Sequence, residues 1–84
     1  MNKRKILARL QNNCKNVRYA DFVSLAEAFG FELRRTSGSH SIYRNPLVGE
    51  ALNLQERNGE AKPYQIKQFL TLIEKYNLKL EDEE

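Results

Sequence analysis

The first thirty residues carry hydrophobic side chains at helical spacing. Residues such as Ile6 and Leu10 recur every three or four positions with basic residues between them, which is typical of an amphipathic helix over residues 3–13. A second hydrophobic stripe predicts a helix over residues 19–29, and Gly30 suits its left-handed C-terminal cap. The chain is therefore expected to begin with two short helices.

From Phe31 onward the hydrophobic period changes from about 3.6 residues to two. Alternation over residues 31–35 predicts a strand with one covered face, and Ser37-Gly38 predicts a tight turn after it. Two further strands are expected over residues 39–45 and 51–55. The polar segment 56–62 is expected to be the least regular part of the chain.

The last predicted helix begins at Pro63, which is well suited to a first helical turn. It is expected to run to about Tyr76, with Gln65 among the polar residues that lie away from its hydrophobic face. Leu78 and Leu80 are expected to fold back onto the core. The order helix, helix, three antiparallel strands, helix predicts an α+β fold with helices on one face of a three-stranded sheet.

We expect one domain over residues 1–84, made of an extra N-terminal helix (1–16), a core (17–80) and an acidic tail (81–84). Four of the eleven acidic residues form this tail, so positions 1–80 hold fourteen basic and seven acidic residues. Such a surplus of positive charge suits a nucleic-acid partner. A solvated basic surface with a solubilising tail accounts for the charge equally well.

Several classes of protein are excluded by composition. No hydrophobic run approaches the roughly 20 residues that cross a bilayer, and the basic N-terminus lacks the apolar core of a signal peptide. We therefore expect no membrane association and a cytoplasmic location. The single cysteine, Cys14, excludes an internal disulfide and is expected to be a small apolar residue near a helix end. The residues present predict neither a metal site nor a small-molecule cofactor.

His40 is the single histidine of the sequence, and a histidine side chain can act as an acid or as a base near neutral pH. It follows Ser37-Gly38-Ser39, whose hydroxyls and backbone N–H groups could hold a phosphate. Strand alternation puts His40 on the same side as Ile42. Either His40 lies at a strand end where the core stops, or Ser41 and Tyr43 face inward instead.

Two stretches of the chain resemble the HicA toxin family. Residues 30–35 (Gly-Phe-Glu-Leu-Arg-Arg) and 38–43 (Gly-Ser-His-Ser-Ile-Tyr) match its signature of a Gly-Phe strand that leads into Gly-Ser-His. Residues 61–66 (Ala-Lys-Pro-Tyr-Gln-Ile) resemble one branch of the family. The likeness covers roughly residues 17–78. It does not include the first helix, and the second histidine that many members carry after the third strand has no counterpart in residues 56–60.

The resemblance implies a fold like that of a double-stranded-RNA-binding domain. It also implies a toxin of a toxin–antitoxin system that cleaves RNA, chiefly mRNA, without a metal, and that a HicB-type antitoxin silences. The family's catalytic histidine corresponds to His40. We add Arg35, Ser39 and Lys62 as candidate RNA contacts.

Three functions remain open from the sequence. The chain is expected to be an endoribonuclease with His40 as general acid or base, assisted by Lys62, Tyr43 or water. A non-catalytic RNA-binding module on the same fold is the alternative, in which His40 is structural. A third possibility is a protein-interaction domain whose basic face binds an acidic partner.

Overall fold

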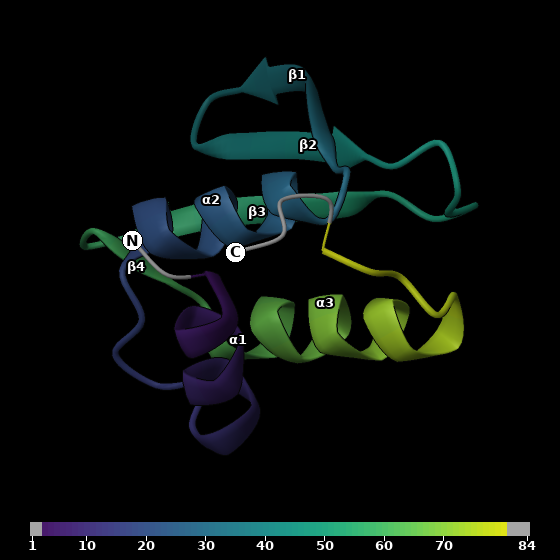
Figure 1. Cartoon of the computed structure of the whole chain (residues 1–84). Helices are drawn as coiled ribbons and strands as arrows, with labels where there is room; N and C mark the ends of the chain where they lie inside the picture. Colours follow the sequence, from purple (N-terminus) through teal and green to yellow (C-terminus); the bar gives the residue numbers. More distant parts are fainter. Residues whose placement is uncertain (1–2, 81–84) are drawn as a thin grey trace.

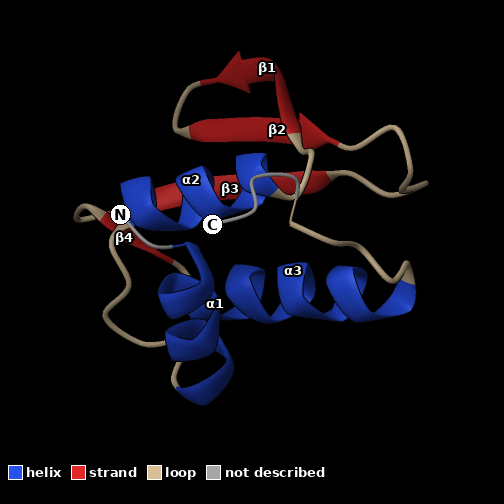
Figure 2. Cartoon of the chain, viewed as in Figure 1, coloured by secondary structure: helices blue, strands red, loops and turns tan. Residues whose placement is uncertain are grey.

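The computed structural model describes residues 3–80, and the acidic tail, residues 81–84, lies outside them. The chain forms an α+β fold in which three helices pack against an antiparallel sheet (Figures 1 and 2). This confirms the predicted fold class. The elements follow one another as α1 (Lys3–Asn12), α2 (Tyr19–Ala28), β1 (Glu32–Ser37), β2 (His40–Arg44), β3 (Leu52–Arg57), β4 (Glu60–Ala61) and α3 (Pro63–Lys75).

The core is centred on the ring of Phe69 in α3. Phe22, Phe29 and Phe31 meet this ring edge-on, with centroid distances of 5.3, 5.7 and 5.9 Å. Edge-to-face pairs of this kind are worth about 0.5–1.5 kcal/mol beyond the area they bury. Leu52 and Leu54 are fully buried on the sheet side of the core. The helices therefore cover one face of the sheet, as the sequence predicted.

The sheet has the order β1-β2-β3-β4, and the fourth strand corrects the sequence analysis. Residues 56–62 are a hairpin and not an irregular loop, because Glu56 pairs with Ala61 and Arg57 with Glu60. Asn58 and Gly59 form its turn with φ angles of 55° and 79°. Asn-Gly is the favoured pair for a turn with two positive φ angles. β4 is also held from its other side, where the Ala61 N–H donates to the carbonyl of Val17 at 2.9 Å.

Strand β1 does not have the covered face that its alternation predicted. All six of its residues are exposed, and Leu33 keeps 51% of its surface in solvent. β1 is an edge strand at the end of the molecule away from α1 and α3 (Figure 1), so no helix reaches beneath it. The register shifts between Leu33 and Arg35, which marks a bulge at Arg34.

A third correction concerns Gln65, which was expected on the polar face of the last helix but is buried. Its side-chain Oε1 accepts the backbone N–H of Gln55 at 3.0 Å. β4 pairs with β3 only at Glu56 and Arg57, so this N–H would otherwise lack a strand partner. Gln65 therefore joins the first turn of α3 to β3.

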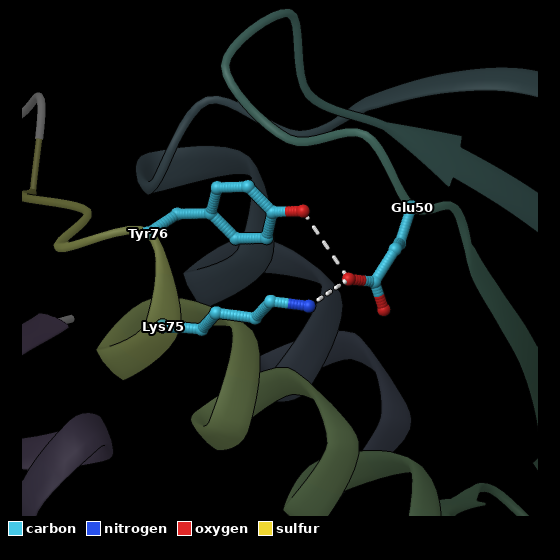
Figure 3. Close-up of polar contacts among 3 residues, drawn as sticks. All are labelled: Glu50, Lys75 and Tyr76. Atoms are coloured by element: carbon cyan, nitrogen blue, oxygen red, sulfur yellow. Dashed lines mark hydrogen bonds and ion pairs between the residues drawn. The ribbon is translucent and has the colours of Figure 1, made fainter.

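The chain after β2 is fixed at two points. Buried Asn45 donates through Nδ2 to the carbonyl of Phe29 at 2.9 Å. Farther along, Glu50 accepts hydrogen bonds from the Lys75 ammonium at 2.8 Å and from the Tyr76 hydroxyl at 3.2 Å. Figure 3 shows both side chains pointing from the end of α3 toward Glu50. This contact ties the end of the last helix to the β2–β3 connection.

Two other expectations from the sequence are met, one for the segment after α3 and one for Cys14. Leu78 is buried and Leu80 packs against the core, so the segment after α3 does fold back. Cys14 is partly buried just after α1, where its Sγ donates to the Leu10 carbonyl at 3.4 Å. Among residues 3–80, no helix combines the length and the apolar character that a bilayer crossing requires.

Candidate functional site

The register of the sheet settles which way His40 points. Tyr43 lies opposite Leu52, and Ser41 lies opposite Leu54, on the buried side of the sheet. His40 and Ile42 therefore face the other way, because side chains alternate along a strand. We call this side, which carries His40, Ile42, Asn53, Gln55 and Arg35, the open face. The second of the two sequence alternatives is the correct one.

The turn between β1 and β2 places His40 at the start of its strand. Ser37 and His40 are directly paired, so Gly38 and Ser39 are the two turn residues. Gly38 has a φ of 62°, which favours glycine, and an ideal Cβ there would meet no atom within 4 Å. Glycine is thus favoured at this position by the backbone angle and not by crowding. His40, the first residue after the turn, is exposed to solvent.

Among residues 3–80, His40 has one polar partner on the open face. Its Nδ1 lies 3.2 Å from Oδ1 of Asn53 in β3. His40 is paired with Gln55 and Ile42 with Asn53, so the histidine and the asparagine are diagonal neighbours on adjacent strands. Asn53 itself is exposed.

Gln55 joins two of the predicted RNA contacts. Its Nε2 donates to the Ser39 hydroxyl at 2.9 Å, and its Oε1 accepts a short hydrogen bond from the Lys62 ammonium. Lysine can only donate, so this bond fixes which end of the amide faces Lys62. Ser39 and Lys62, twenty-three positions apart in the sequence, thereby lie on either side of one side chain.

Arg35, the third predicted RNA contact, also belongs to the open face. It is paired with Ile42, which in turn is paired with Asn53, so these three form the cross-strand row next to that of His40 and Gln55. Arg35 is exposed. The structure thus brings His40, Arg35, Ser39 and Lys62 to one region of the molecule.

Tyr43 does not belong to this region, so its prediction as a possible proton-transfer partner of His40 was wrong. It is 6% exposed and packs in the core. Burial raises the pKa of the Tyr43 hydroxyl, with smaller contributions from Tyr19 and Glu27. A buried phenol on the opposite side of the sheet cannot exchange protons with a substrate bound beside His40.

Asn53 and Gln55 are the site residues that the sequence analysis missed. The sequence does contain a signal for them, because they alternate with the buried Leu52 and Leu54 in a predicted strand. Alternation alone places both on the solvent side. Only the pairing of β3 with β2 shows that this side is also that of His40.

The open face is suited to a polymer rather than to a small enclosed ligand. His40 lies on an exposed strand, whereas a cavity of about 290 Å³ lies at the opposite end of the β1–β2 hairpin, lined by Glu32, Arg34, Arg44, Asn45, Pro46 and Val48. The groups around His40 are hydroxyl, amide, guanidinium and ammonium donors. Such donors are those that contact phosphate oxygens in protein–nucleic acid complexes.

The fold and the position of His40 define a small α+β domain of the double-stranded-RNA-binding type with a histidine exposed beside its first hairpin turn. The family described as HicA toxin of bacterial toxin–antitoxin systems matches residues 19–74, and the chain belongs to this family. The match begins at α2, so α1 precedes it. A search of curated proteins and a search of solved structures each find no match. Family membership makes the chain a toxin of a toxin–antitoxin system with a cognate antitoxin.

Proposed function

We propose that the chain is an endoribonuclease that cleaves mRNA in the cytoplasm without a metal ion, with His40 as its general acid or base. The observation that carries the proposal is the exposed position of His40 among hydroxyl, amide and ammonium donors on one face of the sheet, which are suited to phosphate. A histidine in a structural role would be expected to be packed and enclosed by protein. This one has a ring open to solvent and hence to a substrate.

The chemistry requires little more than positioning and proton transfer. RNA carries its own nucleophile, the 2′-OH, whose oxygen attacks the adjacent phosphorus as the bond from phosphorus to the 5′ oxygen breaks. The 2′-OH loses a proton, and the leaving 5′ oxygen gains one. His40 is suited to one of these two transfers, and solvent water to the other. The products are a 2′,3′-cyclic phosphate and a 5′-OH.

Arg35, Ser39 and Lys62 are proposed to contact the phosphodiester. The guanidinium and the ammonium supply charge-assisted hydrogen bonds to phosphate oxygens, and the Ser39 hydroxyl lies in the turn next to His40. Charge near the bridging phosphate also stabilises the additional negative charge of the transition state. We further propose that the cognate antitoxin is of the HicB type.

The test compares the purified parent with a His40→Ala variant on single-stranded RNA. The variant is expected to lose cleavage by about 10²- to 10⁴-fold, the usual contribution of general acid–base catalysis. Its melting temperature and RNA affinity are expected to stay close to the parent's, because His40 is exposed and the phosphate contacts remain. Lys67→Ala, which removes an exposed cation of α3, is the matched control and is expected to cleave normally.

The same experiment separates the alternative function. If the parent binds RNA but neither the parent nor the variant cleaves it, the chain is a non-catalytic RNA-binding module. Cleavage by His40→Ala at the parent rate would show that another residue carries the reaction.

A further inference from the structure

The contact between His40 and Asn53 distinguishes the two ring nitrogens. An amide oxygen has no proton to give, so Oδ1 of Asn53 can only accept. The 3.2 Å contact with Nδ1 is therefore a hydrogen bond only when Nδ1 carries a proton. In the neutral ring this leaves Nε2, the nitrogen farther from the backbone, with a free lone pair.

We propose that Asn53 is a positioning residue that holds neutral His40 in the tautomer protonated on Nδ1, which makes Nε2 the base for the 2′-OH of RNA. The inference rests on the proposed function for its consequence and on the cross-strand contact for its geometry. A histidine without such a partner favours the opposite tautomer, with the proton on Nε2 and no lone pair available there. Asn53 thus decides between the two proton transfers open to His40.

The step balances as follows. Nε2 takes the proton of the 2′-OH as the 2′ oxygen bonds to phosphorus, and the ring becomes an imidazolium that still donates from Nδ1 to Asn53. The 5′ oxygen leaves with the electron pair of its bond to phosphorus and takes a proton from water. His40 then returns its proton to solvent.

The charged groups of the open face leave the Nδ1 contact to Asn53. By the strand register this face carries Arg44 on β2, Glu32 and Arg35 on β1, Arg57 on β3 and Glu60 on β4, and Lys62 bonds to Gln55 on it. Each of the two carboxylates is paired across the strands with an arginine, Glu32 with Arg44 and Glu60 with Arg57. Among residues 3–80, the polar contact of Nδ1 is with the neutral amide oxygen of Asn53, which therefore sets the tautomer.

The direct test is the tautomer itself, which needs no RNA. His40 is the single histidine of the sequence, so a long-range ¹H–¹⁵N spectrum of the untagged protein shows one imidazole without assignment. The spectrum is recorded at about pH 8.5, where histidine rings are ordinarily neutral. The parent is expected to show protonated Nδ1 and unprotonated Nε2. Asn53→Ala is expected to shift the ring toward the tautomer protonated on Nε2. Asn12→Ala, at an exposed asparagine that ends α1, is the matched control and should leave the spectrum unchanged.

Activity provides a second measurement. Asn53→Ala is expected to lower kcat for RNA cleavage by about 10- to 100-fold with KM nearly unchanged, a smaller loss than removal of the imidazole. Asn53→Asp keeps an acceptor for Nδ1 and adds a negative charge that favours the imidazolium. This variant is expected to keep the parent tautomer and to move the acid limb of the pH–rate profile to higher pH by about one unit.

The tautomer and the cleavage measurements test different parts of the proposal. A parent ring protonated on Nε2, or a tautomer unchanged in Asn53→Ala, would overturn the role of Asn53 whether or not the protein cleaves RNA. The expected tautomers combined with full cleavage by His40→Ala would instead overturn the proposed function, and with it the role of Nε2 as base.

Discussion

At the scale of single residues, the side chain of Gln55 connects more of the site than any charged group in it. It receives the Lys62 ammonium on its oxygen and donates from its nitrogen to Ser39, while its backbone N–H is held by the buried Gln65. Each of these hydrogen bonds contributes about 0.5–1.5 kcal/mol net. Their larger effect is geometric, because a lysine with four rotatable bonds is held in one place.

Replacing Gln55 with methionine is therefore expected to weaken RNA binding by roughly 3- to 10-fold through lost pre-organisation of Lys62. The decisive measurement is a double-mutant cycle of RNA affinity. Gln55→Met and Lys62→Met should be clearly non-additive, whereas Gln55→Met and Lys67→Met should add. Additivity of the first pair would mean that Gln55 does not hold Lys62 for the RNA.

The residues of the site differ in how far the sequence could reveal them. His40 stands out because it is the one histidine and follows a glycine turn. Asn53 and Gln55 are ordinary polar residues in a strand, and their relation to His40 depends on the register between β2 and β3. A shift of one residue in that register would turn both away from it. Register is set by long-range pairing, which local patterns do not encode.

At the scale of elements, the end of α3 is joined to the β2–β3 connection by Glu50. Lys75 is in the last helical turn, where a cation also interacts well with the helix dipole. Hydrogen bonds from Lys75 and then Tyr76 lower the pKa of the Glu50 carboxyl, and the bond to Glu50 raises the pKa of Lys75. The contact links two segments that are twenty-five residues apart.

These two shifts set the pH range of the contact. A lowered carboxyl pKa gives stability that is present above the ordinary carboxyl range and is lost as the pH falls through the folded-state value. A raised lysine pKa gives stability that is lost as the pH rises above the ordinary lysine range. Glu50→Gln is therefore expected to lower Tm by a few degrees at most near pH 7, since the pair is exposed.

The difference in Tm between the parent and Glu50→Gln should shrink as the pH falls below the ordinary range of a glutamate carboxyl and should disappear below the lowered pKa of Glu50. Glu74→Gln, on the same helix and exposed, is the control and should show no such dependence. A Tm difference that stays constant down to about pH 3 would contradict the assignment.

The helices and the first three strands could be predicted from the sequence to within about two residues, whereas the exposure of β1 and the fourth strand could not. A helix is specified by contacts three and four residues apart, which a local pattern contains. The exposure of β1 depends on where the helical layer ends, and β4 depends on a two-residue turn within a polar segment. The Asn58-Gly59 pair was nevertheless a readable signal for that turn.

At the scale of the whole molecule, one face carries the candidate chemistry and the other side of the sheet carries the core. The helices, the phenylalanine cluster and Tyr43 lie together on the buried side, so substitutions on the open face should leave folding largely intact. This separation is what makes the proposed function testable by substitution. The cations of the open face are exposed, so on the proposed function the affinity for RNA should fall as the salt concentration rises, because cations that bind phosphates displace counterions from them.

The proposed reaction as a whole takes its nucleophile from the RNA and its proton transfer from His40, so no step in it uses a metal ion. RNA cleavage by the purified protein is therefore expected to continue unchanged in excess EDTA and to leave 2′,3′-cyclic phosphate and 5′-OH ends. The rate in EDTA and the end groups can be measured on one labelled oligonucleotide, with a substrate that has a 2′-deoxy residue at the cleaved position as the control. That substrate lacks the nucleophile and should not be cut. Cleavage that stops in EDTA and returns with Mg²⁺, or that produces 5′-phosphate ends, would show that water activated by a metal is the nucleophile and that His40 has a different role.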